Sequence, residues 1–349
     1  MSHHLLIRAD ASVAMGTGHV MRSLALAQAW RRNTGSVSFV AAELTPALHA
    51  RLLQERFEIV RLRLIPGGDE DAASMVKMAR KQNASWIAVD GYQFGADYQR
   101  VIQAAGIRLL FVDDYGHAGD YCAELVLNQD LSADASLYDQ SGGNTRLLLG
   151  SRYVLLREEF LLWSHWKRDV SKVGRKVLVT LGGADHDNVT GKVIQVLASL
   201  QNLEMLILVG GSNPHLQTLE SEIRAFRSDI RLALDAPNMP ELMASADVAV
   251  SAGGSTCWEL CFMGLPSIAI LLAENQQTNT FHLAKSGALI CLGWGDQLQG
   301  GLLADTMQKL LNNSSQRERM SVSGRRLLDG LGAERVVAVM RGYVRNEHP

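Results

Sequence analysis

Cysteines are few in this sequence, and long hydrophobic runs are absent. Four cysteines in 349 residues are too few and too scattered for a disulfide framework. Cys257 and Cys261 lie four residues apart, but no second pair of Cys or His completes the ligand set of a zinc site. Apolar stretches such as PSIAILLAE are much shorter than the roughly 20 residues of a membrane-spanning helix. We therefore expect buried free thiols and no membrane partner.

The sequence also has little net charge. Its 34 Lys and Arg residues nearly balance 36 Asp and Glu, which leaves a formal charge of −2. A balance of this kind creates no overall field that attracts nucleic acid, and nothing in it demands a protein partner. The first residues, MSHHLLIRAD, enter a predicted strand at once, without the basic, apolar and cleavage-site order of a signal peptide. We expect a cytoplasmic protein.

Short apolar runs alternate with helical patterns along the whole chain, which is typical of parallel sheets covered by helices. In the first half, strands are predicted at 4–10, 36–43, 58–64, 86–92, 108–116 and 123–130. In the second half they are predicted at 175–183, 203–211, 230–238, 247–254 and 266–274. Helices with apolar residues near i, i+3 and i+4 lie between them, for example at 45–57 and 95–106.

This pattern predicts an α/β protein with two doubly wound, Rossmann-like domains. We place an N-terminal domain at 1–160, a C-terminal domain at 161–330 and a helical tail at 331–349. The charged and aromatic stretch 152–174 contains no predicted strand and is interpreted as the connection between the domains. Ligands of such sheets bind outside the carboxyl ends of the strands, so we expect a central cleft between the two domains.

The loop after the first predicted strand contains the sequence GTGH. A dinucleotide fingerprint needs a third glycine, but Met21 stands at that position, so Gly16 and Gly18 form a tight turn of another kind. His19, at the start of the following helix, is suited to proton transfer, although a histidine at a helix start can also serve packing alone. Arg22 lies one turn further and is expected either to meet a phosphate or to be a solvated charge.

A second glycine loop, SAGGSTCWEL, follows a strand of the C-terminal domain. Gly253 and Gly254 clear space, and Ser255 or Thr256 begins a helix whose free N–H groups favour an anion. Glu259 lies one turn inside that helix, where its carboxylate can accept hydrogen bonds from the hydroxyl groups of a ribose. The alternative is a glycine turn with a surface glutamate. We favour a nucleoside diphosphate site.

Two further loops border the same predicted cleft. Asn275, Gln276 and Gln277 follow the predicted strand 266–274 and are expected to form a polar loop over a sugar attached to the diphosphate. The stretch TLGGADHDN at 180–188 is another glycine turn, which either approaches the phosphates or only reverses the chain.

Polar side chains also follow two strands of the N-terminal domain. Asp90 and Tyr92 come after one buried strand and are expected to face the cleft. Asp113, Asp114 and His117 follow the next strand. Two carboxylates and a histidine are one way to hold a metal, but such groups more often cap loops and helix starts. We favour capping.

Several of these segments, taken in order, resemble the UDP-sugar hydrolases of pseudaminic acid biosynthesis, which release UDP from UDP-2,4-diacetamido-2,4,6-trideoxy-β-L-altropyranose. The segments are RADASVAMGTGHVMRSLALA, VDGY, VDD, YVLLREEF, LGGAD and GGSTCWEL with a following NQ. The family is similar in turn to the B-type glycosyltransferases. The resemblance therefore implies the glycosyltransferase B architecture, with the nucleotide held mainly by the second domain.

The resemblance also implies roles for individual residues. His19 corresponds to the catalytic histidine of the family and Tyr92 to its active-site tyrosine. The 253–256 turn corresponds to the diphosphate site, Glu259 to the ribose carboxylate of the related transferases, and backbone near 236–239 to the uracil site. Water would attack the anomeric carbon with inversion, helped by His19 as base and by Tyr92, without metal or other cofactor. The expected partners are the UDP-sugar substrate and the UDP product.

Two other functions use the same features. A glycosyltransferase of this fold would pass the sugar to an acceptor hydroxyl instead of water. A non-catalytic nucleotide-sugar sensor would keep the GGST loop but has no need of His19. Release of UDP from a UDP-sugar without any acceptor distinguishes the hydrolase from both.

Overall fold

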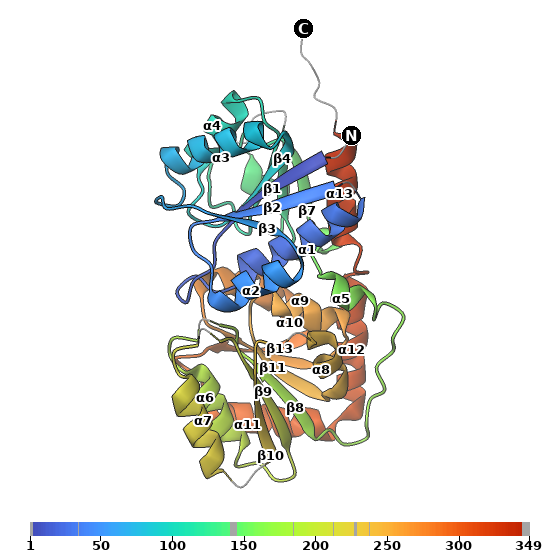
Figure 1. Ribbon diagram of the computed structural model, residues 1–349. Helices are drawn as coiled ribbons and strands as arrows, with labels where there is room; N and C mark the ends of the chain where they lie inside the picture. The colour runs from blue at the N-terminus through green and yellow to red at the C-terminus, as the bar shows by residue number, and fades with distance from the viewer. Residues whose placement is uncertain are drawn as a thin grey trace.

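The computed structural model describes residues 3–33, 35–139, 145–183, 185–211, 213–226, 229–236 and 238–343. These residues form two α/β domains, drawn one above the other in Figure 1, with a parallel sheet in each. Helices cover both faces of each sheet. The fold class predicted from the alternating pattern is confirmed.

The sheet of the N-terminal domain has seven strands in the order β3-β2-β1-β4-β5-β6-β7. Side chains of successive residues alternate between the two faces of a strand, and both faces are buried here. Leu5 and Ile7 of β1 pack beneath α1, α2 and α13, whereas Leu6 packs beneath α3 and α4. The bounds are β1 (His3–Ala9), β2 (Gly35–Ala41), β3 (Glu58–Arg61), β4 (Ala84–Asp90), β5 (Leu109–Val112), β6 (Leu125–Asn128), β7 (Arg146–Leu149), α1 (Gly18–Asn33), α2 (Pro46–Gln54), α3 (Asp69–Lys81), α4 (Ala96–Ala104) and a 3₁₀ turn η1 (Ala135–Tyr138).

The sheet of the C-terminal domain has six strands in the order β10-β9-β8-β11-β12-β13. One face is covered by α6, α7 and α11, and the other by α8, α9 and α10. The bounds are β8 (Lys176–Thr180), β9 (Glu204–Val209), β10 (Asp229–Leu234), β11 (Val248–Ala252), β12 (Ser267–Leu271), β13 (Leu289–Trp294), α6 (Val189–Leu197), α7 (Leu216–Ala225), α8 (Met239–Ser245), α9 (Thr256–Phe262), α10 (Gln277–Lys285), α11 (Gly300–Asn312), α12 (Ser314–Leu327) and a 3₁₀ turn η3 (Glu274–Gln276).

The strands predicted from the sequence all occur, but the two edge strands β7 and β13 were not predicted. The stretches TRLLLG and LICLGW that form them are short and end next to glycine, so their local pattern is weak. They become strands because each extends the sheet from a paired neighbour, β6 or β12.

The chain passes between the domains twice. The connection at 152–174 contains the end of the 3₁₀ turn η2 (Ser151–Tyr153) and the short helix α5 (Glu158–Leu161), but no strand. The last described helix, α13 (Gly332–Gly342), then returns to the N-terminal domain and lies beside α1 (Figure 1). Val336, Val337 and Met340 are buried there. Within the predicted tail, residues 344–349 lie outside the described residues, and the predicted domain boundaries stay a prediction.

None of the helices in the described part of the chain is both long enough and apolar enough to cross a membrane.

The first residue of α13, Gly332, tests how closely this helix must approach the connection between the domains. A Cβ atom on Gly332 would lie 2.2 Å from the carbonyl oxygen of Val154, and backbone cannot move aside as a flexible side chain can. We expect Gly332→Ala to lower the free energy of unfolding by about 1–3 kcal/mol. Gly342→Ala, at the other end of the helix and with no atom within 4 Å, is the control and gains at most about 1 kcal/mol. Urea unfolding followed by circular dichroism measures both, and equal midpoints would contradict this packing.

Candidate functional site

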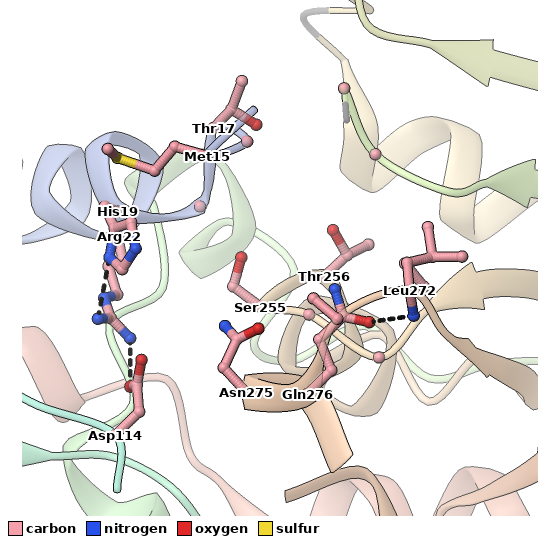
Figure 2. A pocket seen from close by; sticks show the side chains of 18 of the residues that line it. Met15, Thr17, His19, Arg22, Asp114, Ser255, Thr256, Leu272, Asn275 and Gln276 are labelled. Atoms are coloured by element: carbon pink, nitrogen blue, oxygen red, sulfur yellow. Dashed lines mark hydrogen bonds and ion pairs between the residues drawn. The ribbon is translucent and has the colours of Figure 1, made fainter. Parts of the chain in front are cut away.

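A cavity lies between the two domains, at the carboxyl ends of both sheets. Figure 2 shows His19, Arg22 and Asp114 of the N-terminal domain on one side, with Ser255 and Asn275 of the C-terminal domain facing them. Eleven of the residues proposed from the sequence line the cavity: Gly16, Gly18, His19, Arg22, Tyr92, Gly253, Gly254, Ser255, Thr256, Asn275 and Gln276. Glu259, Asp90 and Gln277 do not line it.

His19 is held by a buried carboxylate. Helix α1 begins at Gly18, and its next residue, His19, directs Nδ1 to Oδ1 of Asp90 at a distance of 2.7 Å. Asp90 is the last residue of β4, so the sheet itself fixes where this carboxylate lies. An ionised carboxylate only accepts hydrogen bonds, so a contact this short requires that Nδ1 carries the proton and donates it. The other ring nitrogen, Nε2, is thereby left as the basic atom.

Arg22 binds the same carboxylate through two parallel hydrogen bonds. Its Nε lies 2.7 Å from Oδ2 of Asp90 and its Nη2 lies 2.7 Å from Oδ1. Burial alone would raise the pKa of Asp90, but the Arg22 guanidinium and His19 overcome this effect and hold the pKa well below its usual range. Arg22 also binds Oδ1 of Asp114 at 2.5 Å. The alternative that Arg22 is a solvated charge is therefore wrong, because two carboxylates at the ends of β4 and β5 hold it inside.

Tyr92 connects the two domains across the cavity. Its hydroxyl donates to Oδ2 of Asp114 at 2.5 Å and accepts from Nδ2 of Asn275 at 2.8 Å. Its ring lies edge-on to His19 with 4.8 Å between the ring centroids. Burial and the negative charge of Asp114 raise the pKa of Tyr92 far above its usual range, so the phenol stays protonated. Tyr92 can hold water or a hydroxyl, but it cannot act as a base.

The glycine loop after β11 is shaped by close packing. A Cβ on Gly253 would lie 2.4 Å from Oγ1 of Thr280, whereas beside Gly254 the nearest atom is 3.9 Å away. Gly253 is therefore required for packing against Thr280, whereas Gly254 leaves open space beside it. The two glycine loops also approach each other, since a Cβ on Gly18 would lie 3.6 Å from Oγ of Ser255. The start of α1 therefore lies close to Ser255 of the opposite domain.

The polar segment after β12 differs from its predicted form. Asn275 and Gln276 lie in the 3₁₀ turn η3 and Gln277 begins α10, so none of them belongs to a strand or an extended loop. Oε1 of Gln276 accepts the N–H of Leu272, which fixes the turn to the end of β12.

Glu259 lies in a second cavity that adjoins the first. The two cavities share Gly18, Ser255 and Thr256, and the second is also lined by Ala236 and Met239. Oε1 of Glu259 forms an ion pair with Nη2 of Arg157 at 2.8 Å. Burial raises the pKa of Glu259, and Arg157 acts against this rise. Glu259 is not an exposed surface residue. Of the 236–239 backbone proposed for uracil, Pro237 lies outside the described residues.

The remaining candidates have structural partners. Asp113 accepts hydrogen bonds from His117, from the Tyr121 and Tyr138 hydroxyls at 3.0 and 2.8 Å, and from the N–H of Gly116. Burial would raise the pKa of Asp113, but His117 and these donors lower it to about 2. Asp113 therefore caps a turn, as favoured from the sequence. Over the residues that can be described, no three His, Cys, Asp or Glu side chains are grouped as metal ligands.

One residue of the LGGAD turn stabilises the start of a helix, and others line the first cavity. Asp185 accepts the N–H groups of Val189 and Thr190 at 2.7 and 2.8 Å, and so begins α6. Gly182, Gly183 and His186 line the first cavity. Ala184, within the turn, lies outside the described residues.

Several polar residues that border these cavities were given no site role from the sequence. Among them are Asp114, Gln129 and Asp130 of the first cavity and Arg157 of the second. The sequence placed each of them in a motif or at a strand end. Asp114 belongs to VDDYGH, Gln129 and Asp130 end a predicted strand, and Arg157 lies in YVLLREEF. What the sequence could not indicate is that the ends of β5 and β6 lie beside His19 and Arg22.

Known proteins share both the fold and part of the sequence. The glycosyltransferase family 28 C-terminal domain matches residues 176–328, within the second domain. The spore coat polysaccharide biosynthesis protein SpsG of Bacillus subtilis is 23% identical over 350 residues, covering 99% of both chains. The UDP-2,4-diacetamido-2,4,6-trideoxy-beta-L-altropyranose hydrolase of Campylobacter jejuni is 24% identical over 286 residues, covering 81% of this chain and 97% of its own.

Among solved structures, MurG of Acinetobacter baumannii superposes with a TM-score of 0.67 at 16% identity, covering 98% of this chain and all of that one. The fold is that of the B-type glycosyltransferases. Together the likenesses support a GT-B-like family that includes a named hydrolase as well as transferases.

Because Asp90 is shared by His19 and Arg22, its contribution to the free energy of unfolding is expected to depend on pH. Asp90→Asn leaves the Arg22 charge without one of its two partners, and we expect a loss of about 3 kcal/mol in the free energy of unfolding at pH 7. A carboxylate whose pKa is depressed on folding adds stability above its unfolded pKa, near 3.8, and this stability is lost as the pH falls below it. The difference in the free energy of unfolding between wild type and Asp90→Asn should therefore become smaller as the pH is lowered through 4.

Urea unfolding across this pH range measures the difference, and Asp97→Asn is the control because its side chain is 85% exposed. A loss in Asp90→Asn that is the same at every pH would contradict an ionised Asp90.

Proposed function

We propose that this protein hydrolyses a UDP-linked 2,4-diacetamido-2,4,6-trideoxyhexose to the free sugar and UDP, as in pseudaminic acid biosynthesis. The observation that carries the proposal is the His19–Asp90 pair on one wall of a cavity whose opposite wall is the glycine loop 253–256. The named activity of the Campylobacter relative supports the choice of substrate.

His19 acts as the base in the proposed reaction. Nδ1 donates to Asp90, so Nε2 takes a proton from the attacking water while the water oxygen bonds to the anomeric carbon. The bond between that carbon and the phosphate oxygen breaks, and its electron pair leaves with UDP. Attack opposite the leaving group inverts the configuration. Arg22 touches no reacting atom in this scheme and holds Asp90 in place.

Tyr92 and the carboxylate of Asp114 beside it act on the sugar. The Tyr92 hydroxyl, already fixed by Asp114 and Asn275, keeps one lone pair with which it can accept from the water or from a sugar hydroxyl. The positive charge that develops at the anomeric carbon is stabilised by the carboxylate of Asp114, which borders the same cavity.

The nucleotide occupies the C-terminal wall. Its diphosphate lies against the backbone N–H groups near Gly254, Ser255 and Thr256, which stabilise the charge of the leaving group. The uridine extends into the second cavity, where Glu259 accepts hydrogen bonds from the ribose. Arg157 holds the Glu259 side chain and limits the cost of burying its charge.

A UDP-sugar glycosyltransferase is the second candidate. The match to the glycosyltransferase family 28 C-terminal domain favours it, because that family is named for glycosyl transfer. A non-catalytic sensor has less support, because a bound nucleotide-sugar alone gives no reason for the His19–Asp90 pair.

The test is UDP release by the purified protein from the UDP-diacetamido sugar without any acceptor. We expect turnover in the wild type, and in His19→Ala a fall in kcat of roughly 100- to 10,000-fold with little change in UDP affinity. The anomeric proton in the nuclear magnetic resonance spectrum of the first product should report inversion.

His165→Ala is the matched control, because His165 is exposed and borders a separate cavity beside Arg325. Wild-type turnover in His19→Ala, or retention of configuration, would contradict the mechanism. Turnover only after an acceptor is added would favour the transferase, and binding without turnover would favour the sensor.

A further inference from the structure

The segment that follows β6 brings two polar side chains to the first cavity. The proposed reaction does not use either of them. Gln129 and Asp130 are 3% and 8% exposed, and both line the cavity beside Asp114 and Arg22. A buried polar group costs free energy unless it has a hydrogen-bond partner, and in a cavity this partner is water or a ligand.

The backbone of this segment is fixed from three sides. Asn128 accepts the N–H of Asp130 with Oδ1 at 3.0 Å, and its Nδ2 donates to the carbonyl of Asp114 at 2.9 Å. From the other domain, Oδ1 of Asn279 accepts the N–H of Leu131 at 3.1 Å. The backbone that carries Gln129 and Asp130 is therefore held in place.

The orientation of the Gln129 amide follows from its one hydrogen bond to the protein. Its Oε1 accepts the backbone N–H of Leu155 at 3.0 Å, and a backbone N–H can only donate, so the oxygen and nitrogen of this amide are assigned without ambiguity. No hydrogen bond from its Nε2 to another residue of the described chain is found. The amide nitrogen is a donor that is still to be satisfied.

The carboxyl group of Asp130 has no hydrogen bond and no ion pair with any residue in the described ranges. The charged groups that face it are Asp114, Asp113 and Arg22. Burial and then the negative charge of Asp114 raise its pKa well above the usual range, against the opposing effect of Arg22. Whether protonated or ionised, the carboxyl group of Asp130 has an oxygen that accepts a hydrogen bond.

We propose that Gln129 and Asp130 form a subsite for one amide substituent of the sugar. Nε2 of Gln129 donates to the acyl oxygen of the substituent, and the carboxyl group of Asp130 accepts its N–H. A trans secondary amide points its carbonyl oxygen and its N–H in opposite directions, so Gln129 and Asp130 contact opposite edges of the substituent, whereas a hydroxyl in its place satisfies only one of the two side chains. This inference rests on the proposed function, and it identifies the two residues by which the site selects its substrate.

The test compares three UDP-sugars that differ only in neutral substituents. They are the 2,4-diacetamido sugar and the two analogues in which the acetamido group at C2 or at C4 is replaced by hydroxyl. An amino group is avoided because its positive charge would be attracted to Asp114. We expect wild type to lose roughly 10- to 100-fold in affinity or kcat/KM for one of the two analogues, the one that leaves the subsite unsatisfied.

The variants separate the subsite from a general disturbance of the fold. Asp130→Leu removes the acceptor and Gln129→Glu replaces the donor while keeping the oxygen that Leu155 needs. Both should lose roughly 10- to 100-fold for the diacetamido sugar and should no longer discriminate against that analogue. Asp130→Asn keeps a carbonyl acceptor and should recover most of the discrimination. UDP affinity should change little in all three, and exposed Asp97→Leu is the control.

Calorimetric binding keeps this result separate from the proposed reaction. If wild type binds but does not hydrolyse the sugar, the proposed function fails while the affinities still test the subsite. If Asp130→Leu and Gln129→Glu discriminate among the three sugars as wild type does, or if wild type itself does not discriminate, the subsite is overturned.

Discussion

The carboxylate of Asp90 is the group on which the whole site depends, because His19 and Arg22 share it. One side chain at the end of β4 fixes the tautomer of the histidine and holds the guanidinium. From Arg22 the network continues through Asp114 to Tyr92, and Tyr92 reaches Asn275 of the other domain. The position of the base is therefore coupled, through a short series of buried hydrogen bonds, to the position of the opposite domain. Such networks are strong when every member is satisfied, and weak points when one is not.

The fold explains why these groups meet. The carboxyl ends of parallel strands lie on one edge of a sheet, so β4, β5 and β6 deliver Asp90, Asp114 and Asp130 to one region. The second sheet presents its own edge to the same cavity and supplies mainly backbone and neutral side chains. This division of labour suits a nucleotide-sugar, whose diphosphate needs N–H donors and whose sugar needs acceptors.

The sequence was sufficient for the parts of the molecule with strong local patterns. Alternation of buried strands and amphipathic helices predicted both sheets, and missed β7 and β13 because edge strands this short depend on their neighbours. The loops after β1 and β11 were found from the glycines that follow predicted strands and precede predicted helices. The partners of Arg22, the ion pair of Glu259 with Arg157, and the roles of Gln129 and Asp130 could not be predicted. Each depends on contacts between segments far apart in sequence, which no local spacing encodes.

The central claim is that water attacks the anomeric carbon and UDP leaves with its phosphate oxygen intact. Hydrolysis in water enriched in oxygen-18, followed by mass spectrometry of the UDP, tests this most directly. We expect UDP without the heavy isotope, because the bond that breaks joins the anomeric carbon to the phosphate oxygen. UDP that carries oxygen-18 would show attack at phosphorus and would contradict the role given to His19.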